Sequence, residues 1–411
     1  MNDTATNKAN IKIVFANKFF FHGGGSESVF FQEIEYLRQK GFDVVEFSMH
    51  DPRNVHSDFA RYFVSNVDYN SYSGLLGGLK TAVSFVHSRE AVRKITDLVE
   101  KERPHIAHLH NIYHQITPAI IPVLKKMGVK VIVTLHDGKL VCPAYLMLNR
   151  GRICEMCQGR HFYKALWSNC QESLFRGFML AVEGYWHKWR RSYEGVDLFI
   201  TPSRFLANFV EKYRIPPGKI AVLPNGIDVD RFIPINADGG YVLYFGRLSR
   251  EKGVETLLKA HALLEPEIPL KIVGTGPIED ELRSRYSGPE FVGYKTGGEL
   301  MTLIRNASFV VVPSEWYENC SMAILEAMAY GKAVIGSEIG GIPEQIEDGV
   351  TGLLFEMGKI AQLASKISYL WNHPGIREKM GKASRDRVNK YYSLEQHGRG
   401  LMDLYETVLK K

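Results

Sequence analysis

The sequence predicts an α/β protein built from two Rossmann-like, doubly wound domains that face each other across a cleft. At 411 residues the chain is longer than one hydrophobic core usually supports, so two domains are expected. Short apolar runs alternate with helical patterns in both halves, which indicates buried parallel sheets. The stretch 231–240, with Pro234 and a Gly-Gly pair, is typical of a linker. We therefore place one domain at 1–235 and the other at 236–391.

The composition narrows the classes of function. The chain is 45% hydrophobic and 23% charged, and no run approaches the roughly 18 apolar residues of a membrane-spanning helix. The first ten residues lack the apolar centre of a signal peptide, which predicts a cytoplasmic protein. A net charge of +6 suits attraction to anionic lipid or to a diphosphate, but it does not indicate a nucleic-acid partner.

The first predicted strand, 11–16, leads into a glycine-rich loop and then a helix with apolar residues at Phe30, Ile34 and Leu37. Gly24 and Gly25 lie where a doubly wound domain brings a ligand to a helix N-terminus. A flexible turn without a ligand explains the same glycines equally well. The second strand is expected at 42–48.

Histidines gather around the third predicted strand, 106–109. His105, His108, His110 and His114 could suggest a metal site, and strand alternation puts His108 and His110 on one face. We find no acidic or cysteine partner nearby, so histidines that face the cleft are the preferred interpretation. The fourth strand, 129–135, ends at His136, at the carboxyl edge of the predicted sheet where ligands bind in this class of fold.

Four cysteines follow within 29 positions, and they mark an insertion at about 138–172. Cys142, Cys154, Cys157 and Cys170 have the spacing C-x(11)-C-x(2)-C-x(12)-C. One C-x-x-C pair with two outlying cysteines can form a tetrahedral structural zinc site, or less readily an iron–sulfur cluster. Reduced thiols without metal explain the pattern equally well, so both interpretations remain open.

The stretch 175–193 is helical in pattern, aromatic and basic, with Trp186, Trp189 and Lys188 among its residues. Such a helix can rest on an anionic membrane surface, which would make the protein peripheral on the inner face of the plasma membrane. A helix packed in the core with a charged outer face accounts for the same residues, and we favour it.

The second half begins with a predicted strand at 241–246. Arg247 leaves this strand, and Lys252 stands at the entry of the next helix, so the two cations can clamp a diphosphate beside a helix N-terminus. The strand 270–273 is followed by Gly274 and Gly276, whose backbone could approach a nucleoside. Gly293 ends a further short strand.

The stretch 314–331 organises this half of the chain. It follows an apolar strand at 307–312, contains the turn with Glu318, and continues into a helix at 322–330 that carries Glu326. A strand that feeds a helix through such a turn aims free backbone N–H groups at one spot, which suits a phosphate. Asn319 or Ser321 can cap that helix.

These residues resemble the signature of a known family. Glu318 and Glu326 with seven residues between them, followed by A-M-A-Y-G-K-A-V-I-G and G-G-I-P-E at 340–344, look like retaining, nucleotide-sugar-dependent group 1 glycosyltransferases of the GT-B fold. P-N-G-I-D at 224–228 also matches. The resemblance implies that the helix at 392–411 returns to pack on the first domain. The chain departs from the commonest family pattern at Asn319-Cys320-Ser321, where the family frequently has Gly/Pro-Phe-Gly. The identity of the donor is therefore less certain than the fold.

The resemblance also implies roles for individual residues. Glu326 would bind ribose hydroxyls, Glu318 a hydroxyl of the donor sugar, and Arg247 with Lys252 the leaving diphosphate. His136 would donate a hydrogen bond near the reacting centre, and Asp137 would orient His136 or bind the acceptor. The implied catalytic residues are therefore His136, Glu318, Arg247 and Lys252. The implied donor site adds Gly24, Gly25, Gly274, Gly276, Gly293, Asn319, Cys320, Ser321, Met322 and Glu326.

The predicted activity is retaining transfer of a sugar from a UDP- or GDP-sugar to a saccharide acceptor. A polyprenyl-diphosphate-linked intermediate of surface polysaccharide synthesis is the acceptor that the resemblance suggests. No D-x-D carboxylate pair stands in a metal-holding context, so no cofactor is expected in catalysis. The alternatives are a GT-B epimerase or phosphorylase, or a catalytically silent subunit of a polysaccharide assembly complex.

Overall fold

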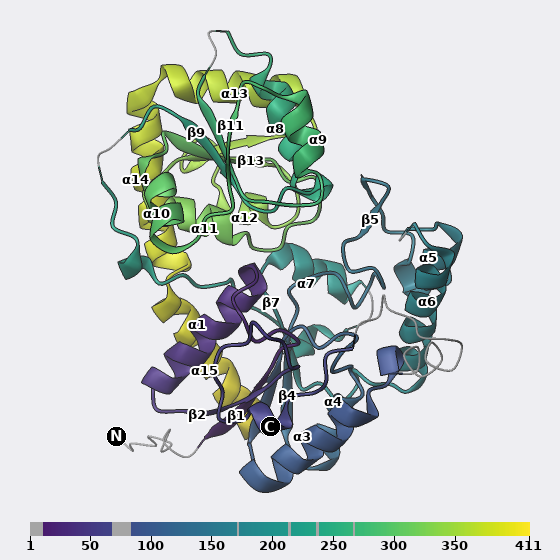
Figure 1. Ribbon diagram of the computed structural model, residues 1–411. Helices are drawn as coiled ribbons and strands as arrows, with labels where there is room; N and C mark the ends of the chain where they lie inside the picture. Colours follow the sequence, from purple (N-terminus) through teal and green to yellow (C-terminus); the bar gives the residue numbers. More distant parts are fainter. Residues whose placement is uncertain (1–10, 68–83, 171, 213–214, 236–237, 266–267) are drawn as a thin grey trace.

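The structure is a computed structural model that describes residues 11–67, 84–170, 172–212, 215–235, 238–265 and 268–411. The first ten residues and residues 236–237, at the predicted domain boundary, therefore lie outside the described residues. Two six-stranded parallel sheets, each covered by helices, form two lobes that stand one above the other in Figure 1. The predicted fold class is confirmed.

The first sheet has the strand order β2-β1-β3-β4-β7-β8. Its strands are β1 (Lys12–Ala16), β2 (Asp43–Phe47), β3 (Ile106–Leu109), β4 (Lys130–Thr134), β7 (Leu198–Thr201) and β8 (Ile220–Val222). The helices of this lobe are α1 (Gly25–Gln39), α3 (Arg89–Glu102), α4 (Ile120–Lys126), α6 (Leu174–Trp189) and α7 (Arg204–Glu211). The strands read as continuous apolar runs because helices bury both faces of the sheet.

The second sheet has the order β11-β10-β9-β12-β13-β14. Its strands are β9 (Val242–Phe245), β10 (Leu270–Val273), β11 (Glu290–Gly293), β12 (Phe309–Val312), β13 (Val334–Ser337) and β14 (Gly352–Phe355). Its helices are α8 (Val254–His261), α9 (Glu279–Arg285), α10 (Gly297–Asn306), α11 (Met322–Ala329), α12 (Ile342–Gln345), α13 (Ile360–Asn372) and α14 (Pro374–Tyr391).

Each sheet has a point where the strand order reverses, between β1 and β3 in the first and between β9 and β12 in the second. In open α/β sheets, ligands bind outside the carboxyl ends of the strands at this point, because the loops there diverge to opposite faces. The loops that follow β9 and β12 carry Arg247 and Glu318. The loops that follow β1 and β3 carry Gly24 and His110.

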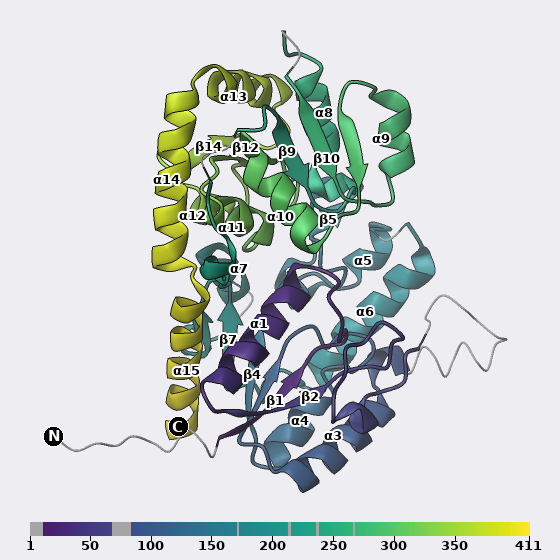
Figure 2. The ribbon, with the colours of Figure 1, turned by 60° about the vertical axis from the view of Figure 1, so that its left-hand side comes forward.

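The last helix, α15 (Leu394–Lys410), leaves the second lobe and packs on the first. Figures 1 and 2 both show α14 and α15 running from one lobe to the other. Ser393 starts the helix, since its hydroxyl accepts a hydrogen bond from the backbone N–H of Gln396. Leu401 and Tyr405 are buried in the same hydrophobic core as β1 and α1.

The cysteine-containing segment follows β4. It holds a hairpin of two very short strands, β5 (Leu148–Asn149) and β6 (Arg152–Ile153), and the single-turn helix α5 (Lys164–Trp167), which packs on α6. Short 3-10 turns occur at Ala60–Tyr62, Gln158–Arg160, Pro217–Lys219, Val229–Arg231 and Arg250–Lys252. Within the described ranges, no helix combines the length and the apolar character needed to cross a membrane.

Candidate active site

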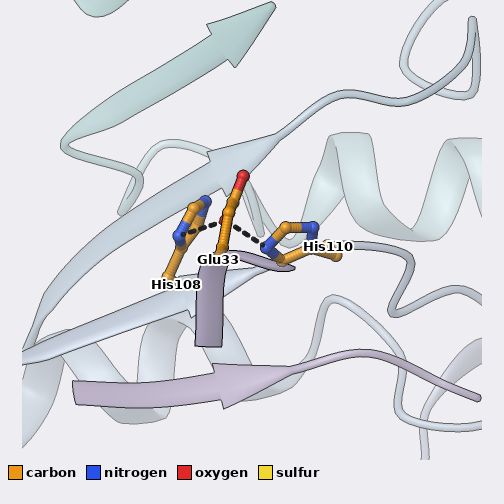
Figure 3. A group of neighbouring side chains, drawn as sticks. All are labelled: Glu33, His108 and His110. Atoms are coloured by element: carbon orange, nitrogen blue, oxygen red, sulfur yellow. Dashed lines mark ion pairs between the residues drawn. The ribbon is translucent and has the colours of Figure 1, made fainter. Parts of the chain in front are cut away.

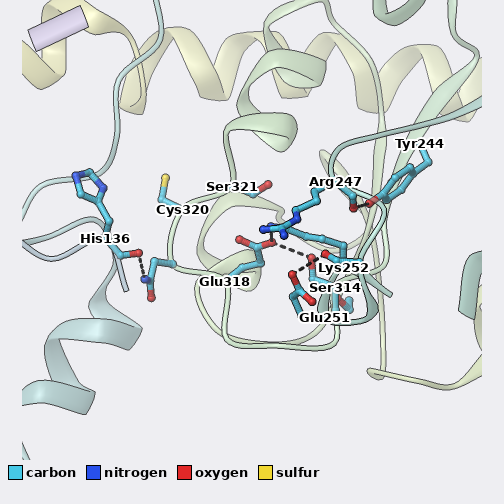
Figure 4. Close-up of polar contacts among 12 residues, drawn as sticks. His136, Tyr244, Arg247, Glu251, Lys252, Ser314, Glu318, Cys320 and Ser321 are labelled. Atoms are coloured by element: carbon cyan, nitrogen blue, oxygen red, sulfur yellow. Dashed lines mark hydrogen bonds and ion pairs between the residues drawn. The ribbon is translucent and has the colours of Figure 1, made fainter. Parts of the chain in front are cut away.

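The centre of the candidate site is an ion pair between Lys252 and Glu318, which belong to loops at neighbouring strands of the second sheet (Figure 4). The hydroxyl of Ser314 donates a further hydrogen bond to Glu318, at 3.0 Å. The ammonium group of Lys252 also lies 4.8 Å from the ring centre of Trp316, within the range of a cation–π interaction. The predicted cation and carboxylate are therefore neighbours.

Glu318 is buried, yet it remains ionised. Burial alone would raise its pKa, but the positive charge and hydrogen bond of Lys252, with the hydrogen bond from Ser314, hold the pKa of Glu318 below its usual value. Arg247 is exposed beside this pair, and no carboxylate of the described residues lies within ion-pair distance of its guanidinium. Its charge is therefore available to a ligand.

The backbone of the loop after Glu318 is held by the Gly-Gly turn that precedes α12. The N–H of Gly341 donates to the carbonyl of Glu318 at 2.6 Å. A Cβ at Gly340, whose φ is +60°, would lie 2.2 Å from that carbonyl oxygen, so only glycine fits there. The side chain of Gln345 both accepts from the N–H of Ser321 at 2.8 Å and donates to its carbonyl at 3.0 Å. Ser321 is the N-cap residue of α11, but its hydroxyl makes no capping hydrogen bond.

The same loop touches the first lobe directly. The amide of Asn319 donates to the backbone carbonyl of His136 at 2.6 Å (Figure 4), and the amide of Asn225 donates to the carbonyl of Cys320 at 3.2 Å. A Cβ at Gly25 would lie 3.3 Å from Cγ of Met322, so the start of α1 faces the start of α11. The structure thus brings Gly24, Gly25 and His136 to the loop 318–322.

Glu344 makes a further contact between the lobes. Its carboxylate accepts hydrogen bonds from the backbone N–H groups of Arg204 and Phe205, at 2.8 and 2.7 Å. These N–H groups open α7 and have no partner within the helix, so the carboxylate stabilises the helix terminus and fixes the two lobes together.

Glu326 lies on α11 and differs from Glu318 in its surroundings. Burial raises the pKa of Glu326 to about 7, and no charge among the described residues offsets this effect. A carboxyl group in this state gains most from a ligand that donates hydrogen bonds to its ionised form, as a pair of hydroxyl groups does.

His136 is part of a chain of buried polar side chains. Its Nε2 lies 2.8 Å from Nδ1 of His110, and Nε2 of His110 lies 3.4 Å from Oε2 of Glu33. Burial, with the charge of His110, lowers the pKa of His136 to about 3, so its ring is neutral at pH 7. The contact with His110 therefore engages Nε2 of His136 and links it to Glu33 through the second imidazole ring. Nδ1 of His136 lies outside this contact, and the donor role that the sequence suggested for His136 stays a prediction.

The second oxygen of Glu33 accepts from Nε2 of His397 on α15, at 3.0 Å. Nδ1 of His397 lies 2.7 Å from the carbonyl oxygen of Pro224, which also can only accept. Both ring nitrogens therefore carry hydrogen, and His397 is an imidazolium. Although burial opposes it, the hydrogen bond and charge of Glu33 raise the pKa of His397. Burial also opposes ionisation of Glu33, but the charges and hydrogen bonds of the histidines hold its pKa well below 4.5.

The prediction that no acidic group lies near the strand-end histidines was wrong. Glu33, far away in the sequence, has its carboxylate within 4.8 Å of the ring nitrogens of His108 and His110 (Figure 3). This geometry could hold a metal ion, but the ring nitrogens of His108 each lie 2.7 Å from a hydroxyl group, those of Tyr405 and Thr134. The cluster is better described as a hydrogen-bonded core.

Asp137 does not orient the ring of His136 but accepts a hydrogen bond from the backbone N–H of Lys139.

The glycines at 274 and 276, predicted to approach a nucleoside, lie where two loops of the second lobe meet closely. A Cβ at Gly274 would lie 1.9 Å from the carbonyl oxygen of Gly246, and one at Gly276 would lie 2.1 Å from that of Leu248. These glycines let the loop after β10 lie directly against the loop that carries Arg247. Gly293 has φ +79° and open space at its Cβ position.

Two parts of the site were missed by sequence reasoning. Gln345 follows the recognised G-G-I-P-E stretch, but nothing in the sequence shows that its amide spans Ser321. Glu33 falls on the buried face of α1, and an acidic residue in an apolar helical stripe is a signal that a buried cationic partner is needed.

Two family models match the chain, one in each lobe. The model described as Glycosyltransferase Family 4 matches residues 23–231, and the model described as Glycosyl transferases group 1 matches residues 228–387. The sulfoquinovosyl transferase of Arabidopsis thaliana is 29% identical over 233 residues, which are 52% of this chain and 45% of that protein. The alpha-maltose-1-phosphate synthase of Mycobacterium tuberculosis is 30% identical over 228 residues, 47% of this chain and 58% of that one. The chain thus spans about half the length of these relatives.

Solved structures show the same arrangement of the two lobes. Sucrose-phosphate synthase from Thermosynechococcus elongatus superimposes with a TM-score of 0.74 at 20% identity, over 97% of this chain and 99% of that one. HepE of Anabaena in complex with UDP superimposes with a TM-score of 0.69 at 16% identity, over 97% of this chain and all of that one. At these identities the similarity shows the fold. With the two family matches, it establishes that the chain belongs to the group 1 glycosyltransferases and has their GT-B fold.

Proposed function

We propose that the protein transfers a sugar from a nucleotide-sugar donor to a saccharide acceptor and retains the configuration at the anomeric carbon. The observation that carries this proposal is the Lys252–Glu318 ion pair beside the exposed Arg247, at the strand-order reversal of the second sheet. A diphosphate fits the two cations, and Glu318 is an ionised acceptor for a hydroxyl of the sugar. Solved complexes of HepE with UDP and with UDP-glucose support a donor of this class.

In the proposed reaction, the bond between the anomeric carbon and the diphosphate oxygen breaks, and a bond from the acceptor hydroxyl oxygen forms on the same face. The hydroxyl proton passes to the departing diphosphate, so no base from the protein is required. Arg247 and Lys252 stabilise the negative charge that builds on the diphosphate, and this is electrostatic catalysis by pre-positioned charges. His136, held by His110, would form a hydrogen bond with a sugar hydroxyl.

Nucleotide binding tests the donor site, and Glu326 sets its expected pH dependence. Ribose hydroxyls that donate to Glu326 favour its ionised form, so affinity for the matching nucleoside diphosphate should rise as pH increases through about 7. We expect UDP or GDP, titrated by calorimetry and thermal shift between pH 6 and 8, to raise the melting temperature, and Glu326→Gln to abolish the pH dependence.

The exposed Glu299 provides the control, because Glu299→Gln should leave this pH dependence intact. The bound nucleotide then identifies which sugar donors to assay, and NMR of the product shows whether the anomeric configuration is retained. If neither nucleotide binds, the proposed function fails. If nucleotide binds but no sugar is transferred to any acceptor, the protein is the silent subunit considered above.

We also propose that α6 contacts an anionic membrane, where a polyprenyl-diphosphate-linked acceptor would reside. The sequence favoured a helix packed in the core, and one face of α6 is indeed buried against the lobe. Its other face is apolar and exposed: Phe175 and Phe178 are each 51% exposed and Trp189 is 71% exposed. Lys188 and Arg190 lie at the end of this face, so charge and apolar surface coincide.

Binding to lipid vesicles tests this contact. We expect the protein to co-sediment with vesicles that contain phosphatidylglycerol and to bind far less to pure phosphatidylcholine. The double variant Phe178→Glu and Trp189→Glu should weaken binding by at least about 100-fold, because each side chain contributes roughly 1.5–3 kcal/mol when it leaves water. Leu263→Glu, at an apolar residue 60% exposed on the second lobe, should bind as the wild type does. Equal binding by all three proteins would contradict the proposal.

A further inference from the structure

The four clustered cysteines line a single cavity beneath the insertion. Cys142 comes from the turn after β4, Cys154 and Cys157 follow the β5–β6 hairpin, and Cys170 follows α5, yet all four contribute to the wall of this cavity. None of them is in a disulfide. The fifth cysteine, Cys320, lies elsewhere, in the loop of the candidate active site.

The insertion has little regular secondary structure of its own. Its regular structure is a hairpin of two-residue strands and one helical turn. Most other residues around the cavity are apolar or small, among them Val141, Met147 and Phe209, and they enclose the sulfur atoms without offering them ionic partners. Burial raises the pKa of Cys142 to about 11 and that of Cys157 to about 12, so without a metal these groups stay protonated. Loop-rich units with little regular structure are often held in shape by disulfides or by a structural metal.

We propose that Cys142, Cys154, Cys157 and Cys170 bind one structural Zn²⁺ ion. Four cysteines that include a C-x-x-C pair are a usual ligand set for tetrahedral zinc. On binding, each thiol loses its proton, so four protons leave and the complex carries two net negative charges. Lys164 lines the same cavity and offsets part of that charge. Among the described residues, the sulfur atoms of the four cysteines do not form a set that lies within 4.8 Å of one another. Binding of the ion would therefore draw them closer together.

The metal would also fix a contact of the candidate active site. Glu155 lies between Cys154 and Cys157, and its carboxylate accepts a hydrogen bond from the hydroxyl of Tyr317 at 2.7 Å. Tyr317 directly precedes Glu318 and packs on Phe205, with 4.8 Å between ring centres. The C-x-x-C turn is thus hydrogen-bonded to the loop of the second lobe that contains Tyr317 and Glu318. The zinc proposal goes beyond the proposed function and does not depend on it.

Metal analysis of the full chain tests the proposal. The protein is purified anaerobically with a thiol reductant from cells grown with zinc and iron, and its metals are measured by mass spectrometry. We expect one zinc per chain in the wild type and in Cys320→Ser, and almost none in Cys157→Ser. A wild type without zinc, a wild type that holds iron instead, or full zinc in Cys157→Ser would each overturn the proposal.

A second measurement keeps the test decisive if Cys157→Ser does not fold. The wild type, exchanged into Co²⁺, should show the visible bands of a tetrahedral ion and a thiolate-to-cobalt charge-transfer band. Absence of the charge-transfer band excludes cysteine ligation. As the thiols are modified stepwise, the amount of metal released should rise in proportion to the number of thiols modified. Metal release that does not follow thiol modification would also exclude cysteine ligation.

Discussion

Replacing Lys252 by methionine should lower the rate of sugar transfer by about 10²–10³-fold, with a smaller change in the KM for the donor. The positive charge acts most strongly when negative charge builds on the leaving diphosphate, so the loss falls mainly on kcat. Methionine keeps an unbranched apolar stem over Trp316, so the packing of the loop is largely preserved. The measurement is steady-state transfer with the donor identified by nucleotide binding.

Arg250 provides a matched control for Lys252. It lies two residues earlier in the same 3-10 turn, is exposed, and pairs with Glu281 on the surface at 3.4 Å. Arg250→Met should retain nearly full activity, because exposed ion pairs contribute little. Lys252→Met alone leaves the buried carboxylate of Glu318 without its cationic partner. The double variant Lys252→Met and Glu318→Gln removes that unpaired charge. If Lys252→Met is folded and transfers sugar at the wild-type rate, Lys252 has no electrostatic role in the reaction.

The second large effect is expected at Glu33, where Glu33→Gln should destabilise the first lobe by about 3–5 kcal/mol. The substitution leaves the imidazolium of His397 buried without its counter-ion, and it removes the ion pair that joins α1 to α15. Urea unfolding at pH 6, followed by circular dichroism, measures the difference in free energy. Glu35→Gln is the control on the same helix, since Glu35 is 54% exposed and pairs only at the surface with Arg231, 3.5 Å away.

The pH dependence of stability separates this ion pair from simple packing. The pKa of His397 is raised in the folded state, so its stabilisation is present below about 6.5 and is lost as pH rises through the folded value. The pKa of Glu33 is lowered, so its stabilisation is present above about 4.5 and is lost as pH falls through its folded value. The pair should therefore contribute most between these limits. Equal alkaline loss of stability in the wild type and in Glu33→Gln would show that the pair does not cause it.

Much of the fold could be predicted from short-range patterns. The strands at 106–109 and 270–273 have the predicted bounds, and the helix predicted at 322–330 is observed at Met322–Ala329. These elements are strongly apolar and end at glycine or polar turns, so local preferences and burial favour the same structure. The exposed face of α6 could not be predicted in the same way. An aromatic stripe on a helix has the same sequence pattern whether it packs against a core or faces solvent.

By itself, the sequence determined that two doubly wound lobes would form, that Arg247, Lys252 and Glu318 would stand at strand ends, and which family the chain resembles. These conclusions depend on periodicity and on residues close together along the chain. Only the tertiary structure decided that Glu33 pairs with His110 and His397, that Gln345 holds Ser321, and that four cysteines share one cavity. The physical reason is that these contacts join residues from separate elements, and their partners are set by how the elements pack.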